Sequence, residues 1–229
     1  MSSQAQLRAP TEDEARAPRA KPLLRGVSHE LAAVASLPAV AARLWSARGP
    51  TAVAAAAVYG ATLVTLFSVS AVYHRRFWSL RARQVVGRLD HSAIFLLIAG
   101  TYTPLGLLVG PGAGHLALAT VWIGAAAGIG LVVGWAGLPK RLRAAIYVLL
   151  GWVVLPVLPA LRHAVGDRGL ALLFAGGAFY TVGAVIYGMR RPDPFPRTFG
   201  FHEVFHLLVI AAAACHYLVV AAAIQALAG

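Results

Sequence analysis

Histidines at helical spacing are the residues of this chain best suited to chemistry. His202 and His206 stand four positions apart in the segment FHEVFHLLV. On a helix such a pair shares one face, one turn apart, and two imidazoles at this spacing can hold one zinc ion. A catalytic zinc site takes three protein ligands and keeps an open position, and we choose His74, at the end of SVSAVYH, as the third ligand. We therefore predict a zinc ion bound by His74, His202 and His206.

Two further polar residues accompany these histidines. Asp90 opens an apolar segment in GRLDHSAIFLL, and Ser70 precedes His74 by one helical turn. Asp90 is a candidate to hold or deprotonate the water at such a metal, and Ser70 is a candidate to orient a ligand or polarise a substrate carbonyl. Interfacial polarity alone accounts for any one of these residues. The combination favours a site, because three apolar segments place titratable residues at one depth.

The other histidines and the single cysteine are interpreted as structural. A lone cysteine excludes an intramolecular disulfide and a cysteine-based zinc site, so a metal must use histidine or carboxylate ligands. His163 is interpreted as a loop residue, and His216 as a packing or hydrogen-bonding group. The histidines interpreted as interfacial are His29, His91 and His115.

The segment from His202 to His206 also reads H-E-x-x-H, which in metalloproteases supplies two zinc ligands and a general base. The metzincin form needs a third histidine where this chain has Ala212, and no acidic residue follows Glu203. A protease would have to take its third ligand from another helix and use Glu203 as the base. An intramembrane protease therefore ranks below a site that uses Asp90.

The segments that carry these residues are long and apolar. Apolar residues make up 59% of the 229 positions, and the mean hydropathy is +0.71. A bilayer core needs about 20 apolar residues per helix, and these runs are continuous, unlike the alternating strands of a membrane barrel. We predict an all-α integral membrane protein, multi-pass in the cell membrane, specifically the bacterial inner membrane. Its seven transmembrane helices are predicted at residues 29–46, 51–73, 86–109, 114–137, 142–161, 169–189 and 203–227.

The basic residues indicate how the chain is oriented. The net charge is +12, but lysines and arginines flank the apolar runs and form no stripe with interleaved aromatics, so no nucleic acid is expected as a partner. Sixteen of the 20 basic residues fall on one side of the predicted membrane and four on the other. Because short cytoplasmic loops carry this excess, we predict a cytoplasmic N-terminus, an extracytoplasmic C-terminus and a site near the cytoplasmic face. Residues 1–24 are predicted to be a disordered cytoplasmic tail, followed by a transmembrane domain at 25–229.

The chain resembles the bacterial hemolysin III proteins, relatives of the progestin and adipoQ receptors and of the alkaline ceramidases. The likeness covers about residues 25–227 and is carried by SHELA, SAVYH, LDHSAIFLLIAGTYTP and FHEVFHLLVIAAAACHYL. It implies a seven-helix fold with a cytoplasmic N-terminus and zinc held by His74, His202 and His206. It also implies that Asp90 contacts zinc through water, with Ser70 beside it. We expect no extracellular domain in this chain, so membrane lipids are the expected partners and a protein hormone is not.

Three hypotheses on function follow. The leading one is a zinc-dependent hydrolase of lipid amide or ester bonds, in which Asp90 shuttles the proton. The alternative is a non-enzymatic protein in which zinc is structural, tying the second and seventh helices together, and which senses or adjusts the state of membrane lipids. A cytolytic or pore protein is the third hypothesis, although the chain has no evident amphipathic pore-forming segment.

Overall fold

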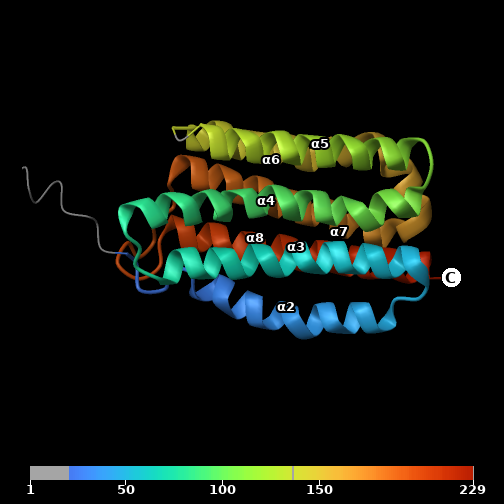
Figure 1. The fold of residues 1–229 in the computed structure, drawn as a ribbon, viewed down its shortest axis with the longest axis horizontal. Coiled ribbons are helices and arrows are strands. Elements are labelled where there is room, and N and C mark those ends of the chain that lie inside the picture. Colours follow the sequence, from blue (N-terminus) through green and yellow to red (C-terminus); the bar gives the residue numbers. More distant parts are fainter. Residues whose placement is uncertain (1–20, 136, 229) are drawn as a thin grey trace, which may run out of the picture.

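Long helices run side by side along one axis in the computed structural model, which describes residues 21–135 and 137–228 (Figure 1). The all-helical prediction is confirmed, since helices make up every long element of these residues. In chain order they are α2 (Val27–Ser46), α3 (Gly49–Arg75), α4 (Leu80–Val109), α5 (Ala113–Gly134), α6 (Lys140–Gly151), the 3₁₀ helix η1 (Trp152–Val157), α7 (Leu158–Met189) and α8 (Phe201–Leu227).

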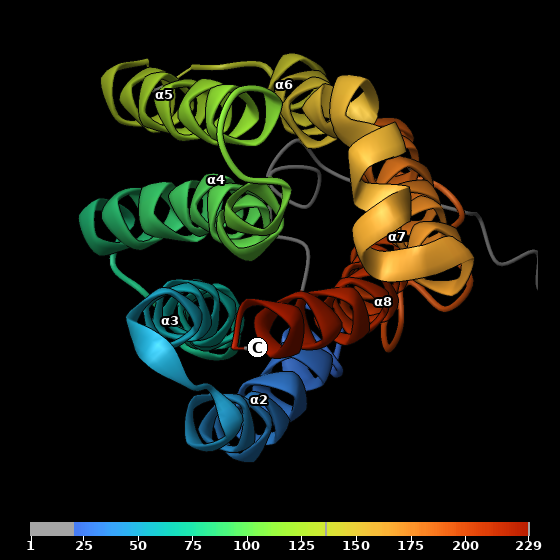
Figure 2. The ribbon, with the colours of Figure 1, turned by 90° about the vertical axis from the view of Figure 1, so that its right-hand side faces the viewer.

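Five helical stretches of the described residues are long and apolar enough to cross a membrane, which agrees with a multi-span membrane protein. One of them, Lys140–Met189, has 50 residues, whereas a single span needs about 20. Gly166 interrupts its helix with a backbone φ of 69°, a left-handed value that glycine adopts easily. The parts α6 and α7 of this stretch lie next to one another in Figure 2. The number of seven transmembrane helices and the orientation of the chain in the membrane stay predictions.

The fifth predicted span, 142–161, differs most from the structure. A single helix was expected, but the chain passes from α6 through η1 into α7. Pro156 lies inside the 3₁₀ helix, and a proline cannot donate the hydrogen bond that a regular α-helix requires. Tyr102 donates its hydroxyl to the carbonyl of Gly151 at 2.7 Å. A side chain of α4 therefore satisfies a carbonyl at the end of α6.

The chain before α2 lies against the segment that leads into α8. The backbone amides of Leu23 and Leu24 donate to the carbonyls of Arg197 and Thr198 at 3.0 and 3.1 Å. Residues 1–20 of the predicted tail 1–24 lie outside the described part of the chain. The four residues from 21 to 24 thus belong to the end of the bundle where α2 and α8 begin and α3 ends (Figure 1).

The helix α4 is the centre of the bundle, and it lies between α3 and α5 in the end-on view of Figure 2. Two glycines allow its close contacts. A Cβ atom at Gly100 would stand 2.0 Å from Oγ1 of Thr62 on α3, and a Cβ at Gly128 of α5 would stand 2.3 Å from the fully buried ring of Phe95. Small residues at helix crossings let membrane helices approach closely. Phe95 and Gly128 thus fix the distance between α4 and α5.

Gly128→Ala is expected to destabilise the bundle by about 1–3 kcal/mol, because the added methyl group must displace the Phe95 ring. The matched control is Gly130→Ala on the same helix, where a Cβ atom would meet nothing within 4 Å. The control should be neutral or slightly stabilising, since alanine favours a helix over glycine. Thermal unfolding midpoints of the purified variants in detergent check this, and equal midpoints would contradict the described packing.

Candidate metal centre

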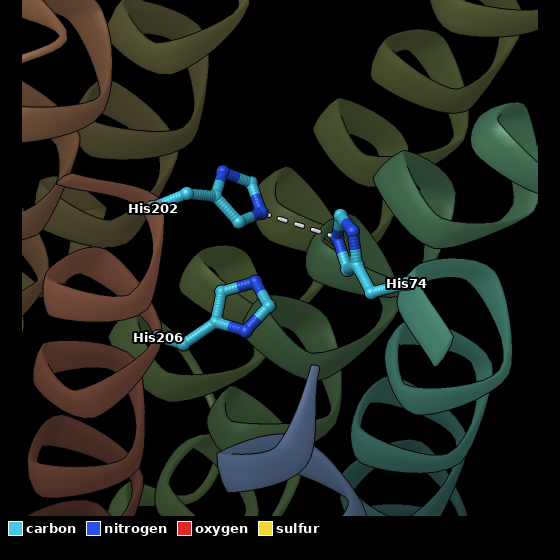
Figure 3. Close-up of side chains that lie close together, drawn as sticks. All are labelled: His74, His202 and His206. Carbon is cyan, nitrogen blue, oxygen red and sulfur yellow. Dashed lines mark hydrogen bonds between the residues drawn. The ribbon is translucent and has the colours of Figure 1, made fainter. Parts of the chain in front are cut away.

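Three histidine side chains from two helices face one another at one end of the bundle (Figure 3). His74 comes from the last turn of α3, and His202 and His206 come from the first two turns of α8. The Nε2 atoms of His74 and His202 are 3.1 Å apart, and one nitrogen from each of the three rings lies within 4.8 Å of the others. His74 and His206 are buried, and His202 is partly buried. The structure therefore brings together the three predicted ligands.

The donor set suits a metal ion. Zinc binds imidazole nitrogens at about 2.0–2.1 Å in tetrahedral geometry, which places neighbouring ligand nitrogens about 3.3 Å apart. The 3.1 Å between His74 and His202 is close to that separation, and His206 completes a triangle of donors. Three imidazoles without a thiolate are ligands that zinc and several other transition metals accept. These three histidines can hold a metal ion with one coordination position left open.

Asp90 and Ser70 lie beside this triangle and line the same cavity. The Oδ2 atom of Asp90 is 3.8 Å from Nε2 of His74, and the carboxylate is buried on α4 with 8% of the residue exposed. Ser70 lies one turn before His74 on α3, and its hydroxyl is 2.9 Å from Nδ1 of His29. The carboxylate thus adjoins a candidate ligand nitrogen, and the serine hydroxyl lies within hydrogen-bonding distance of His29.

His29 is the residue of this site that the sequence reasoning missed. It was interpreted as interfacial, but it is only 3% exposed and its ring stacks on His206 with the centroids 3.8 Å apart and the planes 7° apart. The Nδ1 atom of His206 is buried without a hydrogen-bond partner among the described residues. Ligating histidines are commonly oriented by such a partner, so stacking on His29 takes over this orienting role for the ring of His206. The available signal was the position of His29 at the same end of the bundle as the other three histidines.

Glu203, the second residue of the H-E-x-x-H segment, is bound elsewhere. Its Oε1 atom pairs with Nε of Arg25 at 2.5 Å, and its Oε2 atom accepts from the backbone amide of Gly200 at 2.8 Å. The residue is 2% exposed. One carboxylate oxygen thus holds α8 to the segment before α2, and the other caps the start of α8. Because both oxygens are occupied, the geometry favours Asp90 over Glu203 as the proton acceptor.

Glu203→Gln is expected to lower thermal stability while leaving the metal content of the protein unchanged. The substitution removes the negative partner of Arg25, and breaking a buried ion pair on one side costs about 3–5 kcal/mol. Arg25→Gln should be destabilising in the same way, and the double variant should cost less than the sum of the two. Unfolding midpoints and metal analysis of the three variants check this. Lost activity with unchanged stability and metal content would instead support the protease alternative, in which Glu203 is the general base.

Within the described residues, one cavity is lined by the triangle of histidines and a second, apolar cavity adjoins the first. The polar cavity has a volume of about 230 Å³ and is lined by the three histidines, Asp90 and Ser70. The apolar cavity has a volume of about 130 Å³ and lies deeper in the bundle, between α4, α6, α7 and α8. They share wall residues, namely Leu66, Ile94, Tyr147, Ala184, Phe205 and Val209. An elongated amphiphile can therefore place a polar group at the histidines and an apolar chain between the helices.

The remaining histidines take no part in the triangle. His91 lines the polar cavity, and its backbone carbonyl accepts the Tyr147 hydroxyl at 2.9 Å. A ring nitrogen of His216 lies 3.3 Å from the carbonyl of Leu173, which agrees with the predicted hydrogen-bonding role. His163 is exposed on α7.

The fold and the site together define a class: an all-helical membrane protein with a buried three-histidine cluster at one end of its bundle. Comparison with known proteins gives the family. The model of the haemolysin-III related family matches residues 18–217, and the chain belongs to that family.

Curated relatives come from bacteria, animals and plants. Hemolysin-3 of Bacillus cereus is 31% identical over 84% of this chain and 86% of its own length. The human monocyte to macrophage differentiation factor is 31% identical over 70% of this chain and 66% of its own length. A rice protein named heptahelical transmembrane protein ADIPOR2 is 32% identical over 69% of this chain and 76% of its own length. The predicted resemblance is thereby confirmed.

Proposed function

We propose that this protein is a zinc-dependent hydrolase of lipid amide or ester bonds. The observation that carries the proposal is the position of the Asp90 carboxylate, 3.8 Å from Nε2 of His74, at the edge of a three-histidine cluster. A carboxylate at this place, in a polar cavity that adjoins an apolar one, suits hydrolysis of a bond at the head of a lipid.

The chain crosses the membrane seven times in this proposal. The five apolar stretches become seven spans when α2 is added and Lys140–Met189 is divided at Gly166. The N-terminus is cytoplasmic and the C-terminus extracytoplasmic, and the site lies near the cytoplasmic face of the bacterial inner membrane. The excess of lysine and arginine at one end of the bundle supports this orientation, and the name heptahelical, given to the rice relative, agrees with seven spans.

His74, His202 and His206 hold the zinc ion in this proposal. A zinc ion at such a site polarises a carbonyl and makes water acidic enough to attack at neutral pH. His29 keeps the His206 ring in its plane by stacking, and α3 and α8 supply the fixed ends from which the three side chains project. The metal site is thus positioned by packing between helices.

Asp90 accepts the proton of the attacking water and passes it to the leaving group. Its buried carboxylate is next to His74 and opens to the polar cavity, so it can reach a water molecule there. Ser70 is held by His29 at 2.9 Å and lines the same cavity, where its hydroxyl can donate to a substrate carbonyl. The shared apolar walls of the two cavities exclude bulk water and receive the lipid chain.

The proposal is tested by comparing lipid extracts of membranes that contain the wild-type protein with extracts of membranes that contain Asp90→Ala. Mass spectrometry should show one class of amide- or ester-linked lipid depleted, and its fatty acid product enriched, only with the wild type. Identical lipid profiles at equal protein levels would argue against hydrolysis.

A non-enzymatic function is the second candidate, and a different observation favours it. His74 and the pair His202 and His206 come from helices α3 and α8, so a bound metal would tie these helices together. Such a protein would sense or adjust the lipid state of the membrane without turnover. In this case neither the wild type nor Asp90→Ala would form a lipid product. The substitution would alter only the stability of the protein or a lipid-dependent phenotype.

A further inference from the structure

The polar cavity is lined by far more positive than negative side chains. Asp90 carries the only carboxylate among the described residues that line it. The cationic side chains of its wall are those of Lys21, Arg25, Arg83 and Lys140. Such an excess in a partly enclosed space attracts anions and raises their local concentration.

Arg25 is neutralised by Glu203, but the other cations crowd one another. Burial, followed by the nearby charges of Arg83 and Arg25, lowers the pKa of Lys21. The ammonium group of Lys140 stands 5.7 Å from the centre of the Tyr187 ring, which itself lines the cavity. The charges of Arg83 and Lys140 have no carboxylate partner among the ion pairs of the described residues. An anion between them would relieve this repulsion.

A buried arginine lies behind the same wall. Arg143 is 8% exposed and donates to the Tyr187 hydroxyl at 3.0 Å, and its Nε atom is buried without a partner among the described residues. A buried guanidinium without a carboxylate partner is costly, and such residues in membrane proteins commonly serve a function. Arg143 adds positive potential to the cavity from one turn beyond Lys140 on α6.

The groups of the two cavities follow a fixed order along the bundle. On α4, Arg83 comes first, Asp90 follows seven residues later, and Leu105 of the apolar cavity comes last. Seven residues of helix span about 10 Å. The cations therefore lie on the far side of the histidines from the apolar cavity, where they face whatever part of a lipid extends beyond its hydrolysed bond.

We propose that the polar cavity binds the anionic, phosphate-bearing head group of a lipid, with Arg83 and Lys140 as the principal contacts. This inference rests on the proposed function and names its substrate class: a phosphorylated lipid with its chain in the apolar cavity, its amide or ester bond at the histidines and its phosphate at the cations. A fatty acid alone would place its carboxylate at the histidines and leave Arg83 and Lys140 without a partner.

Basic residues at this end can also set the orientation of the chain in the membrane. A test must therefore separate this role from binding of an anionic head group. Arg81 and Arg141 provide the separation. They lie on the same two helices as Arg83 and Lys140 and carry the same charge, but they do not line the cavity. If the basic residues only set the orientation, substituting Arg83 and Lys140 would affect binding no more than substituting Arg81 and Arg141.

The experiment measures binding without turnover, so that it stands apart from the proposed hydrolysis. Decyl phosphate, decanol and inorganic phosphate are titrated calorimetrically into the purified full-length protein in an uncharged detergent. The proteins compared are the wild type, the cavity variant Arg83→Gln with Lys140→Gln, and the control variant Arg81→Gln with Arg141→Gln. Circular dichroism and thermal unfolding confirm that each variant is folded.

The wild type and the control variant should bind decyl phosphate at least about tenfold more tightly than decanol, which corresponds to about 1.4 kcal/mol. The cavity variant should lose this preference, and inorganic phosphate should compete only weakly because it lacks the chain. Equal binding of decyl phosphate and decanol by the wild type would overturn the inference. So would an equal loss in both variants, or full competition by inorganic phosphate. Phosphate-selective binding by a protein without hydrolytic activity would contradict the proposed hydrolase and leave the head-group site in place.

Discussion

Asp90→Asn is expected to reduce lipid hydrolysis by about 10²–10⁴-fold while the protein keeps its metal and its fold. General acid–base catalysis by one positioned side chain contributes an effect of about this size. Asparagine preserves the shape of the side chain but cannot accept the proton, and the three histidines remain in place. The rate of product formation with the lipid found by mass comparison, at equal metal content, checks the prediction.

Ser92→Ala is the matched control for Asp90→Asn. Ser92 is a buried polar residue on the same helix, two positions away, and it lines neither cavity. It should retain wild-type turnover. If Asp90→Asn hydrolyses lipid as fast as this control, the carboxylate is not the proton acceptor and the function of the site must lie elsewhere.

His202→Ala is expected to abolish metal binding, and with it the sensitivity of the protein to chelators. A metal that binds only the folded protein stabilises it by about 4 kcal/mol at a free concentration a thousandfold above its Kd. A strong chelator should therefore lower the unfolding midpoint of the wild type and leave that of His202→Ala unchanged. His163→Ala, at an exposed histidine of α7, should respond to the chelator as the wild type does.

The opposite pattern would refute this description of the metal centre. If the chelator lowers the midpoint of His202→Ala as much as that of the wild type, the metal is bound elsewhere. If the chelator affects neither protein and both keep their activity, the histidines pack without a metal.

Much of the candidate metal centre was predictable because helical spacing and membrane depth are properties of the sequence. The four-residue interval from His202 to His206 places both rings on one helix face, and the apolar segments set the depth at which His74 and Asp90 lie. These two quantities suffice to bring the four side chains to one end of the bundle.

His29 could not be found in the same way. It has no histidine or carboxylate four positions away with which to form a pair, and its contacts with Ser70 and His206 exist only after α2 packs against α3 and α8. The charge excess of the polar cavity was hidden for a similar reason. Arg83 and Lys140 are 57 positions apart in the chain, and only the fold places both in one wall.

Local backbone effects explain where the predicted helices differ from the structure. Hydropathy places the fifth predicted span but does not give its backbone conformation, which changes to a 3₁₀ helix around Pro156. The break at Gly166 falls within what was predicted as the loop at 162–168, but helix continues on both sides of it. A single glycine with a positive φ is enough to kink the helix there.

The metal content of the purified protein is the most direct test of a three-histidine metal centre. Protein prepared without added metal or chelator is analysed by inductively coupled plasma mass spectrometry, together with His74→Ala, His202→Ala and His206→Ala. The wild type should contain about one zinc per chain, and each variant should contain little or none. A wild type that is folded and fully active without any bound metal would contradict the account.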